Sequence, residues 1–163
     1  MEGKGKILVA SKDGVYLMKF VGDVRVTLCA AADTFLEGMF RDNQFKSVVV
    51  DLSKTTGIDS TSLGILAKLS ILARERFNYT PTLISTNKDI TRLLTSVGFD
   101  DVFRIVREPI AHKEQLGELP KRETSEEDVR ERVLEAHRAL VSLNETNREA
   151  FQDLVKTLEA ASR

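Results

Sequence analysis

The chain has 163 residues, of which 42% are hydrophobic and 30% charged, a composition typical of a folded globular protein and not of a disordered segment. The formal net charge of −1 provides no overall field that would attract nucleic acid or an anionic membrane. The single cysteine, Cys29, excludes an internal disulfide and is typical of a small buried residue in a reducing cytoplasm.

The first part of the chain predicts a hairpin, a helix and a buried strand. Alternation of apolar and polar residues, together with β-branched residues, predicts strands at 6–11 and 15–24, which are joined by a short turn that ends in a glycine. Apolar residues at helical spacing then predict a helix over 27–42. Consecutive apolar residues at 47–52 predict a strand that is covered on both faces, and a loop is expected over 54–59.

A regular alternation of helix and strand continues to residue 106. The predicted elements are a helix at 60–77, a strand at 82–86, a helix that begins after Asn87 and a last strand at 102–106. Asn87 is a suitable N-cap, and Gly98 is placed to adopt the left-handed conformation that ends a helix. Two leading strands followed by this alternation predict an α/β domain with a mixed sheet that carries helices.

The last third of the chain predicts a linker followed by a helical extension. Residues 109–123 contain prolines, a glycine and many charges, which is typical of a linker. Residues 124–163 begin with a capping-box pattern at 124–127 and continue with apolar residues at alternating three- and four-residue spacing. The members of this seam are Val133, Ala136, Leu140, Leu143, Asn147, Ala150, Leu154 and Ala161. The seam predicts one long helix in which polar Asn147 fixes the register of a coiled coil.

The sequence leaves two questions about the extension open. A second capping pattern at 146–149 allows a break near Asn144, which would give a helical hairpin in place of one long helix. The apolar seam can pack on the α/β domain or on itself, or it can serve as a partner-binding helix through which the protein self-associates.

The segment most informative about function lies at residues 51–66, where the buried strand ends and the next helix begins. Three consecutive hydroxyl residues, Ser60, Thr61 and Ser62, follow Asp59 at the start of this helix. Backbone N–H groups at a helix N-terminus lack intrahelical partners and lie at the positive end of the dipole, so a phosphate on an exposed hydroxyl there would be stabilised. Asp59 or Ser60 could equally act only as an N-cap, which is the commoner role of such residues.

Residues 58–64, with the sequence Ile-Asp-Ser-Thr-Ser-Leu-Gly, resemble the signature of STAS domains, in particular that of anti-sigma factor antagonists. The order of elements from residue 6 to residue 106 is also similar, as are the Val-Gly-Asp element at 21–23 and the helix end at 93–99. The resemblance implies a STAS-type mixed β-sheet flanked by helices over residues 1–108, with the linker and the helical extension after it.

The resemblance also implies a function. A protein of this kind binds an anti-sigma factor that is itself a serine kinase, and thereby releases a sigma factor. Phosphorylation of the serine after the aspartate, which is Ser60 here with Thr61 as the alternative, would switch binding off, and a metal-dependent serine phosphatase would restore it. The implied partner-binding residues are Asp23, Arg25, Gly57, Ile58, Asp59, Ser60, Thr61, Ser62 and Gly64. Two of them depart from the family pattern, which usually has an acidic residue in place of Arg25 and a glycine in place of Ser62.

Other functions are considered beside this one. A non-switching STAS scaffold, of the stressosome type or in a lipid-transport complex, would share the fold. A phosphotransfer receiver with Asp51 as phosphate acceptor would need an acidic pair after the first strand, which the sequence lacks. We expect no catalysis, cofactor or metal, because His112 and His137 have no ligand spacing and are predicted to be surface residues.

Membrane association is not expected either. The first residues are rich in glycine and lysine and have no signal-peptide pattern. The longest apolar stretch, residues 63–73, is too short to span a bilayer and contains Lys68. The sequence therefore predicts a cytoplasmic protein that binds other proteins and not membranes or nucleic acid.

Overall fold

A computed structural model describes residues 4–109 and 115–161 and contains a six-stranded mixed sheet with the strand order β5-β4-β3-β2-β1-β6. Strands β1 (Lys6–Lys12) and β2 (Val15–Val24) form the predicted antiparallel hairpin. Gly14 in their turn has a φ of +85°, and a Cβ there would lie 1.9 Å from the Gln44 carbonyl oxygen, so both conformation and space require glycine.

The parallel part of the sheet follows β2. Strand β3 (Ser47–Ile58) pairs with β2, β4 (Thr82–Ile84) pairs with β3, and β5 (Arg104–Val106) pairs with β4, all in parallel. In β3 the alternate residues Val48, Val50 and Leu52 are fully buried. These strands confirm the predicted α/β order, although β4 and β5 are shorter than the sequence predicts.

Strand β3 is twice as long as predicted, and the loop expected at 54–59 is wrong. The polar residues of this segment continue to pair with the second half of β2, across two register shifts that mark bulges. The hydroxyl of Thr55 is buried and donates to the Phe20 carbonyl oxygen at 2.7 Å, which satisfies a polar side chain inside the sheet. The extended strand places residues 59 and 60 directly after the carboxyl end of β3.

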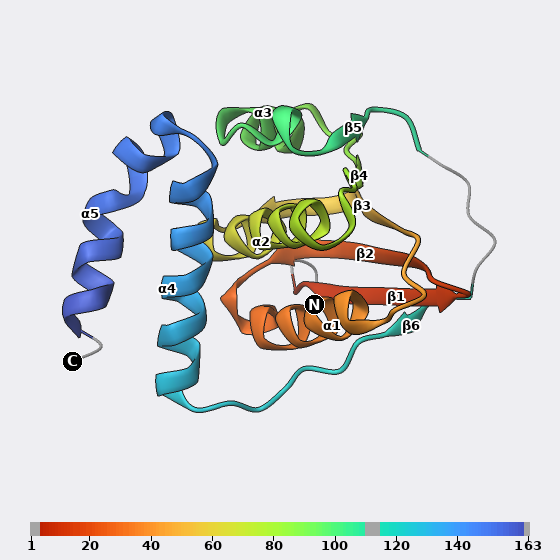
Figure 1. Cartoon of the computed structure of the whole chain (residues 1–163), viewed down its shortest axis with the longest axis horizontal. Coiled ribbons are helices and arrows are strands. Elements are labelled where there is room, and N and C mark those ends of the chain that lie inside the picture. Colours follow the sequence, from red (N-terminus) through yellow and green to blue (C-terminus); the bar gives the residue numbers. More distant parts are fainter. Residues whose placement is uncertain (1–3, 110–114, 162–163) are drawn as a thin grey trace.

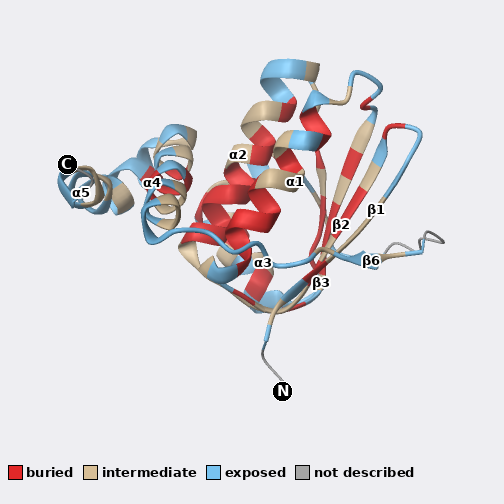
Figure 2. Ribbon diagram, turned by 90° about the horizontal axis from the view of Figure 1, so that it is seen from below, coloured by how far each residue is buried: buried red, intermediate tan, exposed pale blue. Residues whose placement is uncertain are grey.

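Three helices cover one face of this sheet, and the described residues place no helix on the other face (Figures 1 and 2). They are α1 (Cys29–Arg41), preceded by the 3₁₀ turn η1 (Val26–Leu28), α2 (Ser60–Phe77), and α3 (Lys88–Ser96), followed by the 3₁₀ turn η2 (Phe99–Asp101). Asn87 caps α3 and Gly98 has a φ of +81°, as predicted. The largest fully buried side chains of this domain include Met18, Leu36, Leu52, Leu66, Leu69, Leu83, Leu94 and Phe99.

The C-terminal extension is a helical hairpin and not one long helix. Helix α4 (Glu126–Leu143) ends at Asn144, and α5 (Glu145–Ala161) runs back along it (Figure 1). The cap of α5 is Asn144, whose side-chain oxygen accepts from the Asn147 amide at 2.8 Å, so the capping pattern at 146–149 is not used. The cap of α4 is Ser125, which accepts from the Asp128 amide at 3.0 Å. The break changes the helix register, and Leu154 of the expected seam is 41% exposed.

A short strand lies within the segment that the sequence predicts as a linker. Strand β6 (Gly117–Glu118) pairs antiparallel with β1, and the Leu119 amide donates to the Ile7 carbonyl oxygen at 2.7 Å. This pairing covers the outer edge of β1 and fixes the chain to the sheet shortly before α4 begins. In the described part of the chain, no helix has the length and apolar character needed to cross a membrane.

Candidate functional site

The start of α2 is fixed by Asp59, the last residue before the helix. One carboxylate oxygen accepts from the Ser62 amide and the other from the Val26 amide, each at 2.8 Å. The first bond caps α2, and the second joins the 3₁₀ turn η1 to the same point. A single side chain thus fixes both of the backbone segments that surround the predicted site.

Ser60, the first residue of α2, is hydrogen-bonded to a histidine from the C-terminal extension. Its Oγ lies 2.8 Å from Nε2 of His137, and Nδ1 of the same ring lies 2.7 Å from the Val133 carbonyl oxygen. A carbonyl oxygen can only accept, so in the neutral imidazole Nδ1 carries the proton and Nε2 accepts from the Ser60 hydroxyl. Ser60 is half-buried because His137 lies against it.

The prediction that His137 is a surface residue is wrong, since only 2% of it is exposed. The ring of Phe151 in α5 packs against the imidazole, with 5.8 Å between the ring centroids. The prediction for His112 lies outside the described residues.

The other two hydroxyl residues at the start of α2 are buried in the domain. Thr61 is 6% exposed and Ser62 is 3% exposed. The hydroxyl of Ser62 donates to the Val24 carbonyl oxygen at 3.4 Å and lies 3.7 Å from the sulfur of Cys29. Of the three hydroxyl residues, Ser60 is therefore the most accessible.

Two glycines allow neighbouring elements to come close to this site. A Cβ at Gly57 would lie 2.6 Å from a carboxylate oxygen of Asp23, the residue opposite it in the sheet. A Cβ at Gly64 would lie 2.2 Å from the carbonyl oxygen of Ala136 in α4. At this point α2 has no space for a side chain, because the backbone and Cβ of Ala136 occupy it.

The rim of the site carries an ion pair on the side of β2. Arg25 donates from Nε to a carboxylate oxygen of Asp23 at 2.8 Å, and 61% of the Arg25 side chain is exposed. The carboxylate of Asp23 therefore balances the positive charge of Arg25 at this rim. Surface pairs of this kind contribute about 1 kcal/mol or less to stability, so Arg25 remains available to a partner.

A buried ion network joins α4 to α1 and α2. Lys68 contacts Asp33, Glu37 and Glu135, each within 2.9 Å, and Arg132 contacts Asp33 at 2.6 Å. Burial alone would lower the pKa of Lys68, but the three carboxylates raise it above its ordinary value. Burial raises the pKa of Asp33, and Lys68 opposes this effect. The network holds the extension on the domain through charge as well as through packing.

Cys29 lies beside the site and is buried. Burial raises the pKa of its thiol to about 12. We expect alkylation of native Cys29 by iodoacetamide at pH 8 to be slower than that of the urea-unfolded protein by roughly a hundredfold or more, because the thiolate is the reactive form. Mass spectrometry of timed samples measures the two rates, and a native rate equal to that of glutathione would contradict the burial of this residue.

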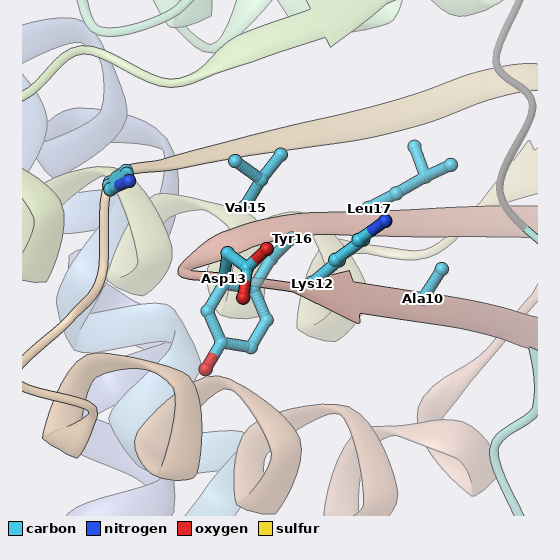
Figure 3. A pocket seen from close by; sticks show the side chains of 7 residues that line it. Ala10, Lys12, Asp13, Val15, Tyr16 and Leu17 are labelled. Atoms are coloured by element: carbon cyan, nitrogen blue, oxygen red, sulfur yellow. The ribbon is translucent and has the colours of Figure 1, made fainter.

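Two hollows of the surface differ in their distance from the site. One of about 280 Å³ lies at the β1–β2 turn, at the end of the sheet where β3 begins and thus far from Ser60. Figure 3 shows Val15 and Leu17 on one side of β2 there, while the ring of Tyr16 extends toward α1. A second hollow, of about 250 Å³, separates η1 and the start of α1 from the start of α4. Residues 4–109 and 115–161 contain no group of three or more His, Cys, Asp or Glu that could hold a metal ion.

The structure therefore brings the predicted site residues together at one end of the sheet but covers part of them. Asp23, Arg25 and Gly57 lie at the rim, and Ile58 and Asp59 lead into α2. Ser60 and Gly64 lie beneath α4, and Thr61 and Ser62 are buried in the domain. Packing of the extension on the α/β domain is one of the alternatives that the sequence leaves open, but the position of this cover over Ser60 is not predicted. The only signal was the seam, in which Val133 and Ala136 flank His137 on the helix face that packs inward.

Comparisons with known proteins agree with this architecture. A family model described as the STAS domain matches residues 6–114, more than half of the chain. The solved structure titled "NMR Structure of the protein TM1081" superimposes with a TM-score of 0.53 at 18% sequence identity, over 60% of this chain and 78% of that one. At this identity the likeness concerns the fold alone. No curated protein matches the sequence.

Proposed function

This chain belongs to the STAS domain family, and on that premise we propose that it is an anti-sigma factor antagonist whose binding is switched by phosphorylation of Ser60. The observation that carries the proposal is the position of the Ser60 hydroxyl. It lies at the first residue of α2, directly after the capping aspartate, and is more accessible than the hydroxyls of Thr61 and Ser62. The accessibility favours Ser60 over Thr61 as the modified residue.

The switch would act through charge. In the reaction the γ-phosphoryl group of ATP moves to Ser60 Oγ, ADP leaves, and the hydroxyl proton passes to a base of the kinase. The new group carries about −1.5 to −2 charges at neutral pH and is stabilised by the N-terminus of α2. Docking of an anti-sigma factor on this surface would bury that charge, and a penalty of about 3–4 kcal/mol would weaken binding by two to three orders of magnitude.

The substitution Ser60→Ala tests this proposal. Tagged full-length protein is used to capture its partner from cells, and the complex is incubated with and without ATP. Wild type should gain one phosphoryl group by intact mass and release the partner, whereas Ser60→Ala should stay bound. Thr56→Ala, which removes an exposed hydroxyl four residues earlier, is the control and should behave as wild type. Equal behaviour of wild type and Ser60→Ala would remove Ser60 from the mechanism.

A non-switching STAS scaffold, of the stressosome type or in a lipid-transport complex, is the second candidate function. It is favoured by one observation, the position of Ser60 beneath α4. It predicts that the captured partner stays bound in the presence of ATP and that the mass of the protein does not change.

A further inference from the structure

Helix α4 lies on the face of α2 that carries Ser60. Three residues at intervals of four along α2 face it, namely Ser60, Gly64 and Lys68. Their counterparts are consecutive in α4: Ser60 bonds to His137, Gly64 approaches the carbonyl of Ala136, and Lys68 pairs with Glu135. The stripe of α2 on which a partner would dock is thus already occupied by a segment of the same chain.

The fit between the two helices leaves no room for a second occupant. At Gly64 the backbone of α2 comes so close to Ala136 that even a methyl group would overlap the carbonyl oxygen. The Ser60 hydroxyl donates to His137, and an esterified Oγ carries no proton with which to make this bond. The closed arrangement therefore excludes both a docked partner and a phosphorylated Ser60 in its present contact.

The hairpin is held at both ends of this contact. Near its start, the ion pairs of Arg132 and Glu135 join α4 to α1 and α2. At its turn, the side chains of Asn144 and Asn147 both donate to the Val97 carbonyl oxygen, at 3.3 and 2.9 Å. Phe151 of α5 packs on the imidazole of His137, so the two helices support the contact together.

We propose that the C-terminal hairpin is an autoinhibitory cover, which must leave α2 before Ser60 is phosphorylated or a partner docks. The proposal rests on the proposed function, because it concerns access to the same surface. It predicts that the free protein is closed and that any change which loosens α4 raises the rate of modification at Ser60.

Two substitutions loosen the contact from opposite sides. Gly64→Ala adds a methyl group to α2 where the Ala136 carbonyl oxygen lies, and Ala136→Leu enlarges α4 at the same point. The second variant leaves the STAS domain itself unchanged, so an altered docking residue cannot explain its effect. Gly38→Ala is the matched control: this glycine also lies within a helix, but a Cβ there meets nothing within 4 Å.

The first measurement is hydrogen exchange of the purified full-length proteins, which needs no partner. We expect the amides of α4 to exchange at least tenfold faster in Gly64→Ala and Ala136→Leu than in wild type and Gly38→Ala. The amides of β2 and β3 should be unaffected, which shows that the domain remains folded. Unchanged exchange in α4 of both variants would overturn the proposal, because the close packing on which it depends would not hold the hairpin.

The second measurement is the initial rate of phosphoryl transfer to Ser60 by the kinase captured with the protein, followed by intact mass with ATP. We expect both loosened variants to be modified at least tenfold faster than wild type and Gly38→Ala. Equal rates in all four proteins, together with faster exchange in α4, would overturn the autoinhibitory role and leave the proposed function intact. If Ser60 is not phosphorylated in any of the four proteins, including the two with a loosened hairpin, the result would contradict both the proposed function and this inference.

Discussion

Replacement of Asp33 by asparagine should lower the free energy of unfolding by about 3 kcal/mol, near the lower end of the range for breaking a buried ion pair. Asp33 is almost fully buried and joins Lys68 of α2 to Arg132 of α4. Asparagine keeps the volume of the side chain but removes the charge, so both cations lose their most buried partner. Urea unfolding followed by circular dichroism measures the change.

Two other carboxylates on the same ammonium group provide the controls. Glu37 and Glu135 also contact Lys68, but 41% and 56% of their side chains are exposed. Because water screens exposed pairs, Glu37→Gln and Glu135→Gln should each cost less than about 1 kcal/mol. Equal losses for all three substitutions would mean that burial does not determine the strength of this network.

Replacement of Asp59 by alanine should destabilise the protein by about 2–3 kcal/mol. The substitution leaves two backbone amides, those of Val26 and Ser62, without their charged acceptor. One amide belongs to η1 and the other to α2, so the loss affects two elements at once. Urea unfolding again gives the change in free energy, and hydrogen exchange should show faster opening of η1.

The matched control is Asn87→Ala. Asn87 is also an N-cap that accepts from two amides, but both belong to its own helix α3. Its loss should cost about 1 kcal/mol, the usual value for a helix cap. If Asp59→Ala lowers the free energy of unfolding no more than Asn87→Ala does, the result would contradict the conclusion that Asp59 stabilises both η1 and α2.

The sequence predicted the elements whose patterns are local. The strand at 15–24 and the helix at 60–77 agree with the structure, because alternation and helical spacing reflect burial within one element. Asn87 and Gly98 were likewise identified from the backbone conformations that these residue types favour. Local rules were sufficient wherever the neighbouring residues along the chain determine the structure.

Hydrogen bonding between strands that are distant in the sequence could not be predicted from such local patterns. The second half of β3 is polar, and residues 54–57 have the composition of a loop. They form a strand because β2 continues beside them across two bulges and because the buried Thr55 hydroxyl finds an acceptor in β2. Tertiary hydrogen bonds therefore outweigh local preference in this segment.

Packing of the extension on the α/β domain was one of the expected alternatives, but its position over Ser60 was not predicted, for a related reason. The spacing of apolar residues in the extension shows that one face is buried, but not which surface buries it. His137 was interpreted without the ring of Phe151 and the hydroxyl of Ser60, both of which are distant in the sequence. A polar residue next to Ala136 on a packed face was the only local sign of its role.

The short pairing of β6 with β1 has a consequence for any competitor of the hairpin. Residues 119–125 alone separate β6 from α4, and at about 3.5 Å per residue they allow the released helices to move only some 25 Å. A tethered segment of this kind returns to its place with an effective concentration in the millimolar range. A freely diffusing regulator at micromolar levels must outcompete this local excess.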